Sequence, residues 1–434
     1  MNWKQKVSNR DLKVGIMGLG YVGLPLACAF ARSGFNVLGF DIDEKKVKQI
    51  NRNHSPLEDL SDADLTEASK SGMLQATDQM DRLSEVDAVH ICVPTPLRKS
   101  RDPDISFIAR ATETLVEYFE PPGIITLEST TYPGTTEEIL ATTFSDADWD
   151  LEEEIHLAFS PERIDPGNRE FGLENTPKVL GGYTDQARRV ASNLYGEVVN
   201  EVVEVSSTRA AEMVKLLENT FRSINIGLAN EMALLSHEME IDVWEVIDAA
   251  STKPFGFMPF YPGPGLGGHC IPIDPLFLSW KARLHNTTSR FIDLADEINR
   301  SMPDYVTRLI LDALNEESKS VNGSRICLLG VAYKPNVGDV RESPAIEVTR
   351  NLLDRGGDLV FCDPYVEEFS VEGKKIPSIT QTEAIENRFD LSVILTDHDH
   401  FKWAEILESN RLLVDTRDAL KTFDIPRGVR VVKL

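Results

Sequence analysis

A glycine-rich turn close to the N-terminus restricts the fold of this chain more than any other sequence feature. The apolar run 14–17 leads into Gly18-Leu19-Gly20-Tyr21-Val22-Gly23, and an apolar helical pattern over 24–32 follows. A second apolar run, 36–40, is closed by Asp41. A strand, a Gly-x-Gly-x-x-Gly turn, a helix, a second strand and an acid make up a dinucleotide-binding βαβ unit. The alternative is an ordinary glycine turn in an α/β protein.

Each residue of such a turn has its own physical task. Gly18 permits the tight turn, Gly20 lets a pyrophosphate approach the backbone, and Gly23 lets helix and strand pack closely. The N-terminus of the helix offers free N–H groups to the phosphates. Asp41 is placed to accept hydrogen bonds from ribose hydroxyls and to reject a 2′-phosphate. We therefore expect NAD, rather than NADP, as the cofactor.

Later strand patterns extend the same sheet. Apolar runs recur at 88–93, 124–128 and 156–160. Helical stretches separate them, which predicts a parallel sheet made of βαβ units and a NAD-binding Rossmann domain over residues 1–205. Pro94 and Thr95 end one of these runs, at the sheet edge where doubly wound folds bind ligands. They are either cofactor contacts or part of a plain proline loop.

The middle of the chain has a different pattern. Residues 207–240 read as helix without proline, longer than an ordinary globular helix, which predicts a long helix, whole or in two pieces, that joins domains or pairs subunits. The Gly/Pro-rich stretch 254–275 is too long for a casual linker, so we expect a functional loop. Helix resumes to about residue 314. The predicted second domain, over 206–314, is helical and holds this loop.

The last segment, 315–434, repeats the strand, turn, helix and strand pattern of the first. Strand, helix and strand patterns follow one another at 325–330, 343–355 and 358–362. Lys334 and Arg341 place cations in its turn where the first turn has glycines. This repeated pattern predicts a second Rossmann-like domain. The expected class is therefore α/β, with two doubly wound parallel-sheet domains joined by a central helical region that contains a long helix.

Composition limits the partners. The chain has 434 residues, more than one core usually supports, and its 45 Lys+Arg against 70 Asp+Glu give a formal charge of −25. This charge repels nucleic acid and anionic membranes, so neither is expected as a partner. No stretch reads as a signal peptide or a membrane span, which favours a cytoplasmic protein. Five scattered cysteines predict neither a disulfide framework nor a metal site.

Cys270 is the first candidate for chemistry. It follows the pair Gly267-Gly268, which leaves a thiol open to a substrate carbon, and Asp274 is close enough in sequence to assist a base or a water. This pattern indicates covalent catalysis, although a single cysteine is also commonly a buried small hydrophobe. A dyad with His269 is disfavoured, because adjacent side chains point apart.

Two further pairs carry polar groups that suit catalysis. Lys215 and Asn219 are spaced i, i+4 on one helical face and could stabilise an alkoxide or oxyanion, or could form a solvated face. Glu162 and Arg163 follow a strand, where they could supply a base and an anion clamp, or form a surface ion pair.

Seven motifs stand in order along the chain: GLGYVGLPLA (18–27), CVPTPL (92–97), ESTTYPGTT (128–136), FSPERIDPGN (159–168), AEMVKLLENTFR (211–222), FYPGPGLGGHCIPIDP (260–275) and GVAYKPNVGDVRESPA (330–345). With them, nearly the whole chain resembles the UDP-glucose/GDP-mannose dehydrogenases. The loop TPLRKSRDPD (95–104), SPER followed by DPGN, and HC before Ile271 make it most similar to the UDP-N-acetylglucosamine 6-dehydrogenase branch. The glucose branch has a glutamate where this chain has Pro166, so that cofactor contact is not carried over.

The resemblance implies a four-electron oxidation of a sugar C6 alcohol to the carboxylate with two NAD in succession. Glu162, or a water it orders, removes the hydroxyl proton in the first step. Cys270 captures the aldehyde as a thiohemiacetal, and a second hydride transfer gives a thioester. Water activated with help from Asp274 and Thr130 hydrolyses it, while Lys215 and Asn219 hold the negative oxygen. The expected substrate is UDP-N-acetylglucosamine, for surface polysaccharide.

The resemblance also implies binding residues. Those expected to bind NAD are Gly18, Gly20, Tyr21, Val22, Gly23, Asp41, Lys46, Pro94, Thr95, Thr130 and Arg341. Those expected to bind the UDP-sugar are Glu162, Arg163, Lys215, Asn219, Phe260, Tyr261, Gly263, Gly265, Gly267, Gly268 and Lys334. The helix from Ser207 resembles an element that pairs subunits, so a homodimer or a higher homo-oligomer is expected.

Other functions stay open on the sequence. The same chemistry could act on UDP-N-acetylmannosamine, UDP-N-acetylgalactosamine or UDP-glucose. A two-electron dehydrogenase, or a catalytically silent NAD-binding regulator, would keep the fold without the complete reaction.

Overall fold

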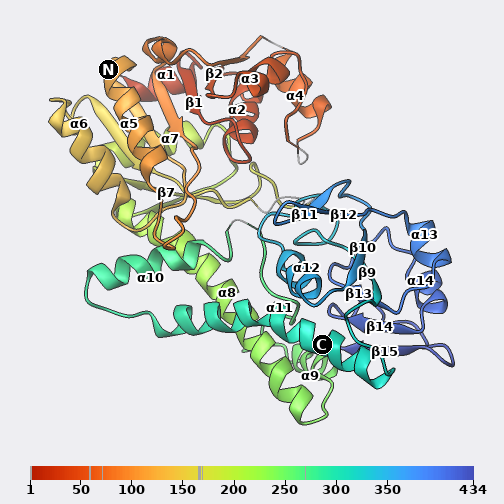
Figure 1. The fold of residues 1–434 in the computed structure, drawn as a ribbon. Helices are drawn as coiled ribbons and strands as arrows, with labels where there is room; N and C mark the ends of the chain where they lie inside the picture. Colours follow the sequence, from red (N-terminus) through yellow and green to blue (C-terminus); the bar gives the residue numbers. More distant parts are fainter. Residues whose placement is uncertain (1, 58–59, 71, 165–167, 169, 269) are drawn as a thin grey trace. The chain divides into compact units, whose positions relative to one another are not determined.

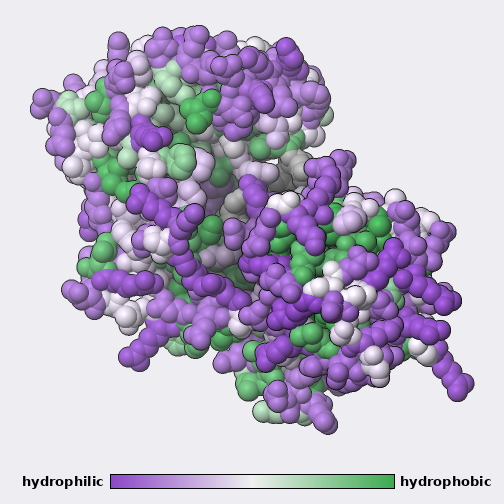
Figure 2. All heavy atoms as spheres, in the orientation of Figure 1, coloured by the Kyte–Doolittle hydropathy of each residue, from purple (hydrophilic) through white to green (hydrophobic). Residues whose placement is uncertain are grey.

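The computed structural model describes residues 2–57, 60–70, 72–164, 168, 170–268 and 270–434. The chain forms two compact units, drawn in Figure 1. Unit 1 contains Met1–Glu218 and Leu276–Thr287, and unit 2 contains Asn219–Pro275 and Thr288–Leu434. Hydrophilic side chains cover most of the face shown in Figure 2. None of the helices in the described part of the chain is long and apolar enough to cross a membrane.

Unit 1 is built on an eight-stranded sheet with the order β3-β2-β1-β4-β5-β6-β7-β8. Its strands are β1 (Lys13–Met17), β2 (Asn36–Phe40), β3 (Leu74–Thr77), β4 (Ala88–Ile91), β5 (Gly123–Leu127), β6 (Ile155–Phe159), β7 (Lys178–Gly182) and β8 (Val202–Val205). All neighbours pair parallel except β6 and β7, which are antiparallel. The central strands β4, β5 and β6 are buried along their whole length, as expected for a sheet covered on both faces.

Helices cover both faces of this sheet (Figure 1). They are α1 (Trp3–Ser8), α2 (Gly23–Arg32), α3 (Glu44–Ile50), α4 (Asp62–Ser69), α5 (Ser106–Tyr118), α6 (Thr142–Asp146) and α7 (Asp185–Tyr195), with the short segments η1 (Met80–Glu85) and η2 (Thr136–Ala141). One apolar core lies under α1, α2, α4 and α7, and the other under α5, η2 and α6. The sheet edge is thereby held rigidly enough to position side chains that follow the strands.

Unit 2 contains a second parallel sheet with the order β10-β9-β13-β14-β15. Its strands are β9 (Arg325–Leu329), β10 (Asp358–Cys362), β13 (Leu391–Ile394), β14 (Leu412–Asp415) and β15 (Arg430–Lys433), beside the hairpin of β11 (Phe369–Val371) and β12 (Lys374–Ile376). Its later helices are α12 (Pro344–Asp354), α13 (Gln381–Glu386) and α14 (Trp403–Ser409). The predicted α/β class with two parallel sheets is confirmed.

The helical region is dominated by α8 (Thr208–Glu238), one unbroken helix of 31 residues. It is followed by α9 (Val243–Ser251), α10 (Asp274–Leu284) and α11 (Arg290–Glu316). Gly227 of α8 lies against Ala295 of α11, where an added Cβ would come within 3.1 Å of the alanine Cβ. This glycine therefore allows two helices of unit 2 to pack closely. The division into segments 1–205, 206–314 and 315–434 stays a prediction.

The predicted functional loop 254–275 begins and ends two residues earlier than expected. Its described residues from 252 to 273 form neither helix nor strand, and α10 begins at Asp274. Asp274 and Pro275 thus open a helix, where proline at an early position and an acid in the first turn are both favourable.

Candidate functional site

The glycine turn of unit 1 has the backbone geometry that its sequence predicts. Gly18 has φ +93°, and a Cβ there would lie 2.6 Å from the carbonyl oxygen of Cys92. A Cβ on Gly23 would collide with the carbonyl oxygen of Gly18. Gly20 has no heavy atom within 4 Å of the position of an added Cβ. The turn is tight at its ends and open at its centre, which fits the approach of a pyrophosphate.

The acid at the end of β2 is oriented by three donors. The Asp41 carboxylate accepts the N–H of Leu19 at 2.9 Å, the N–H of Asp43 at 3.0 Å and the Lys46 ammonium at 2.8 Å. Asp41 is buried, while Tyr21 on the turn is exposed. The two predicted cofactor residues Asp41 and Lys46 are thus in direct contact, and the carboxylate is fixed beside the glycine turn.

Replacing Asp41 with Asn is expected to raise the KM for NAD about tenfold and to increase the relative use of NADP. The neutral amide makes a weaker hydrogen bond to a ribose hydroxyl and no longer repels a 2′-phosphate, and a charged hydrogen bond contributes about 1.5–3 kcal/mol. Initial rates with both cofactors measure the ratio. Asp43→Asn, which changes only the N-cap of α3, is the matched control. An unchanged NAD/NADP ratio in Asp41→Asn would contradict the assignment.

The ends of β4 and β5 bring further candidates to the same sheet edge. Pro94 and Thr95 follow β4, and half-buried Thr130 follows β5. Ser129 ties the two segments together, because its hydroxyl donates to the carbonyl of Val93 at 2.7 Å. β1, β4, β5 and β6 are consecutive in the sheet, so the glycine turn, Thr95, Thr130 and Glu162 all follow neighbouring strands.

Glu212 of α8 anchors the segment that carries Thr130. Its buried carboxylate accepts the N–H groups of Gly134 and Thr136 and the Thr136 hydroxyl. Burial raises its pKa, and these hydrogen bonds oppose the rise. Sequence reasoning did not select Glu212, although it lies inside one of the seven motifs.

Glu162 and Arg163 have different surroundings in spite of being adjacent. The Glu162 carboxylate is buried, and it accepts the N–H of Arg163 at 2.6 Å and that of Ile164 at 2.7 Å. The Arg163 guanidinium donates to the carbonyl of Pro177 and forms an ion pair with Glu218 of α8 at 2.7 Å. Arg163 thus forms an ion pair with α8, which is the alternative to its predicted role as an anion clamp. Residues 165–167, including Pro166, lie outside the described residues.

A buried lysine, which sequence reasoning missed, lies next to Glu162. Lys178, the first residue of β7, is 4% exposed, and its ammonium is 3.4 Å from Glu162 and 2.6 Å from Glu128. Desolvation lowers the pKa of Lys178, but Glu128 and Glu162 outweigh it and the pKa is raised. The available signal was a lysine that opens an otherwise apolar run, Lys178-Val179-Leu180.

In unit 2, three residues of the predicted catalytic set, Cys270, Asp274 and Asn219, are linked by hydrogen bonds. Asn219 donates from Nδ2 to Oδ2 of Asp274 at 2.5 Å, and the backbone N–H of Asp274 donates to the carbonyl of Cys270 at 2.8 Å. Cys270 is exposed, whereas Asp274 is buried. Lys215, also buried, precedes Asn219 by one turn of α8. His269 lies outside the described residues.

The other four cysteines differ from Cys270. All are buried, and burial raises the pKa of Cys28 to about 11 and that of Cys362 to about 12. The pKa values of the Cys92 and Cys327 thiols are raised as well, again chiefly by burial. Thiolate chemistry is therefore disfavoured at these four positions.

The loop before Cys270 is fixed from both sides within unit 2. Gly263 donates its N–H to Asn230 at 2.9 Å, and a Cβ there would meet the Arg417 guanidinium at 2.7 Å. Gly268, with φ +81°, donates its N–H to the carbonyl of Arg341 at 3.2 Å. Asn230, which accepts a hydrogen bond from this loop, and Arg417, which lies against it, were not selected from the sequence.

The other predicted site residues of unit 2 lie in this loop or beside it. Gly265 has φ +135°, and a Cβ on Gly267 would lie 2.6 Å from Cβ of Tyr333, next to the half-buried Lys334.

Tyr261 stacks on Trp244 and donates its hydroxyl to Asp248, while the ring of Phe260 packs against Phe221. Arg341 pairs with Asp339 at 2.7 Å. The structure thus brings the glycine loop beside the cationic turn 331–341.

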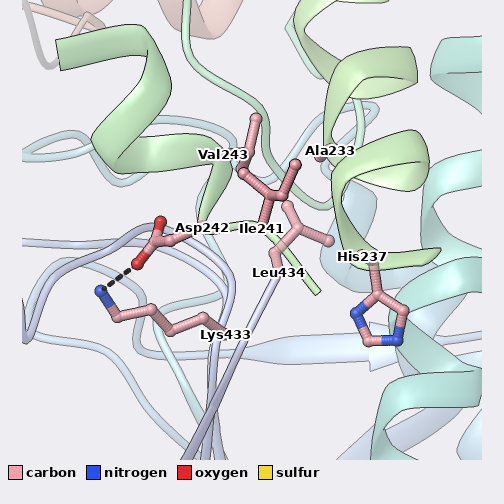
Figure 3. Close-up of a pocket in the computed structure, with 7 residues that line it drawn as sticks. All are labelled: Ala233, His237, Ile241, Asp242, Val243, Lys433 and Leu434. Atoms are coloured by element: carbon pink, nitrogen blue, oxygen red, sulfur yellow. Dashed lines mark hydrogen bonds and ion pairs between the residues drawn. The ribbon is translucent and has the colours of Figure 1, made fainter. Parts of the chain in front are cut away.

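A separate small hollow of unit 2 contains none of the predicted site residues. Figure 3 shows its lining, with the Lys433 ammonium directed at Asp242 at 3.5 Å. The lining residues are Ala233, His237, Ile241, Asp242, Val243, Lys433 and Leu434.

The glycine turn, its acid and the parallel sheet define a dinucleotide-binding α/β protein, and the thiol, carboxylate and amide of unit 2 add a group suited to covalent chemistry. Comparison with known families places it more closely. Residues 12–199, 209–301 and 327–422 match the NAD binding, central and UDP binding domains of the UDP-glucose/GDP-mannose dehydrogenase family. The chain belongs to this family of nucleotide-sugar dehydrogenases, and NAD is its cofactor.

Similar proteins cover nearly the whole chain. A UDP-N-acetyl-D-mannosamine dehydrogenase of Pyrococcus horikoshii is 35% identical, over 94% of this chain and 96% of its own length. A UDP-N-acetyl-D-glucosamine 6-dehydrogenase of Pseudomonas aeruginosa is 32% identical, over 91% of this chain and 92% of its own. The solved structure of a UDP-D-ManNAc dehydrogenase from P. horikoshii has a TM-score of 0.88 at 33% identity, over 97% of this chain and 99% of its own.

Proposed function

We propose that the protein oxidises the C6 alcohol of a UDP-N-acetylhexosamine to the carboxylate in two successive NAD-dependent steps. The observation that carries the proposal is that the exposed Cys270 is joined to the buried Asp274 by a backbone hydrogen bond, and that the Asp274 carboxylate accepts a hydrogen bond from the Asn219 amide. NAD, when bound, supplies the acceptor for a hydride. A dehydrogenase that stopped at the aldehyde would have no use for the thiol.

The chain's own groups divide the chemistry among them. Glu162 takes the proton of the C6 hydroxyl, directly or through a water. The Cys270 sulfur adds to the aldehyde carbon, and loss of a second hydride from that carbon leaves a thioester. A water activated with help from Asp274 and Thr130 attacks the thioester and restores the thiol. Lys215 and Asn219 stabilise the negative oxygen in each step.

For the sugar, the relatives favour the manno epimer over the gluco epimer that the sequence motifs predict. The similar proteins named as UDP-N-acetyl-D-mannosamine dehydrogenases share 33–35% identity with this chain, and those named as UDP-N-acetyl-D-glucosamine 6-dehydrogenases share 31–32%. UDP-N-acetylmannosamine is therefore our first candidate, and UDP-N-acetylglucosamine is the second. The gluco assignment and a role in surface polysaccharide remain predictions.

The number of NADH molecules released per sugar tests the proposed reaction, and a panel of UDP-sugars tests which one is the substrate. Purified enzyme with limiting UDP-N-acetylmannosamine is expected to release two NADH per sugar consumed and to form the uronate. One NADH per sugar would identify a two-electron dehydrogenase, and no NADH with any substrate would identify a silent NAD-binding protein. Comparison of kcat/KM for UDP-N-acetylmannosamine, UDP-N-acetylglucosamine, UDP-N-acetylgalactosamine and UDP-glucose assigns the epimer.

Subunit pairing through α8 is part of the proposal. Exposed apolar side chains of α8 within unit 2 follow a 3–4 spacing, as in the seam of two paired helices. They are Phe221, Leu228, Met232 and Leu235, each at least 37% exposed.

The double variant Leu228→Glu/Leu235→Glu is expected to halve the molecular mass measured by light scattering, because two charges would be buried in each copy of the seam. Glu238→Gln, at the exposed C-terminal end of the same helix, is the control and should leave the mass unchanged. A mass equal to one chain in the unmodified protein would rule out this pairing.

A further inference from the structure

Behind Glu162, unit 1 contains a continuous buried network of ionisable side chains. The Lys178 ammonium links Glu162 at 3.4 Å to Glu128 at 2.6 Å. The Tyr195 hydroxyl donates to the other oxygen of Glu128 and lies 2.8 Å from Nδ1 of His90. Glu128, Tyr195 and His90 are completely buried, and Lys178 is 4% exposed. The five groups come from β4, β7, α7 and the segments that follow β5 and β6.

The charges of this network can be assigned from its contacts. Burial lowers the pKa of His90 to about 3 and raises that of Tyr195 well above its usual value, so both are neutral. Burial raises the pKa of Glu128 and the Glu162 carboxylate adds to the rise, while the Lys178 ammonium and the Tyr195 hydroxyl oppose it. With both carboxylates ionised, the network has a net charge of −1. Transfer of the sugar hydroxyl proton to Glu162 would remove this net charge from the buried network.

We propose that Lys178 and Glu128 are positioning residues that control how strongly Glu162 acts as the base for the sugar hydroxyl. This inference rests on the proposed function. Lys178 holds the Glu162 carboxylate in place. Glu128 offsets the charge of that ammonium, so that Glu162 is oriented by a cation without losing its capacity to accept a proton. Neither residue contacts the reacting atoms.

The two residues should act on the base in opposite directions. If Glu128 becomes neutral, Lys178 is opposed only by Glu162, and the ionised form of Glu162 is stabilised more strongly. If Lys178 becomes neutral, Glu162 faces the Glu128 carboxylate without a cation between them. Among the described residues, the Cys92 thiol also interacts with Glu128, Lys178 and Glu162, and burial raises its pKa, which keeps it protonated.

The test is the acid limb of the kcat/KM–pH profile in three variants. Glu128→Gln is expected to move this limb to lower pH by about one unit, and Lys178→Met to move it to higher pH by a similar amount. Lys178→Arg should restore the wild-type position, because it keeps the charge. An acid limb that stays in place in both Glu128→Gln and Lys178→Met, or that moves in the same direction in both, overturns the proposal.

A matched control separates charge from loss of stability. Glu212→Gln removes another buried carboxylate of unit 1 and should lower the melting temperature without moving the acid limb. If Lys178→Met does not fold, the pair Glu128→Gln and Lys178→Arg still decides, since only the first should move the limb.

A readout without turnover keeps the inference distinct from the proposed function. Carbon NMR titration of protein labelled at the glutamate carboxyl carbons, with Glu162→Gln to assign the signal, follows Glu162 directly. If Glu128→Gln still releases two NADH per sugar but the titration of Glu162 does not move, the inference is wrong and the proposed function stands. If the titration moves in a protein that produces no NADH, the inference stands and the proposed function is wrong.

Discussion

A Cys270→Ser variant is expected to lose uronate formation, with the rate of complete oxidation falling on the order of 10⁴-fold or more. The serine hydroxyl is a far weaker nucleophile than a thiolate, so the aldehyde is not captured and the second oxidation does not start. The first hydride transfer needs no thiol and should persist. NADH released per sugar, with mass spectrometry of the products, measures the effect directly.

The matched control is Cys28→Ser in α2. Cys28 is buried in the apolar core of unit 1, so the hydroxyl should cost about 1–3 kcal/mol of stability but leave the product unchanged. Selective alkylation adds a second check, since Cys270 is the exposed cysteine and the other four are buried. Full uronate formation by Cys270→Ser at two NADH per sugar would remove the thiol from the mechanism.

Replacing Lys215 with Met is expected to lower kcat by about 10²–10³-fold with a smaller change in KM, the magnitude found when one donor to a developing oxyanion is removed. Charge grows on the sugar oxygen only as the reaction proceeds, so the ammonium contributes more to the transition state than to substrate binding. Lys215 is 8% exposed, which strengthens its electrostatic effect relative to a surface lysine. Steady-state kinetics with saturating NAD separates kcat from KM.

Arg222→Met on the same helix is the control for loss of a cation, because Arg222 is exposed. Lys215→Arg should recover part of the rate, since it restores the charge but not the geometry of an ammonium. A kcat for Lys215→Met no lower than that of Arg222→Met would show that Lys215 is only a structural part of α8.

The parts of the fold that follow from local sequence could be predicted well. The turn 18–23 is encoded in part by Gly18 and Gly23, which no other residue can replace without a collision, and the apolar runs beside it became β1 and β2. The parallel sheet of unit 2 followed from the same pattern. The strand β7 was not predicted, and the composition of a buried strand does not indicate that it runs antiparallel to its neighbour.

Contacts between distant segments explain what the sequence left out. Lys178 and Glu128 are 50 residues apart, and nothing near either one indicates that an ammonium and a carboxylate will be buried together. The link between Asn219 and Asp274 joins two residues for which sequence reasoning proposed separate tasks, and these are 55 positions apart. Only the path of the backbone between the strands and helices brings these groups into contact.

The three donors that hold Asp41 have a thermodynamic consequence for cofactor binding. Because Leu19, Asp43 and Lys46 already orient the carboxylate, NAD does not have to order this side chain when it binds, and the entropic cost of ordering is met when the protein folds. The affinity for NAD is therefore coupled to the local stability of the glycine turn. A substitution that loosens this turn would weaken NAD binding even if every group that contacts the cofactor were unchanged.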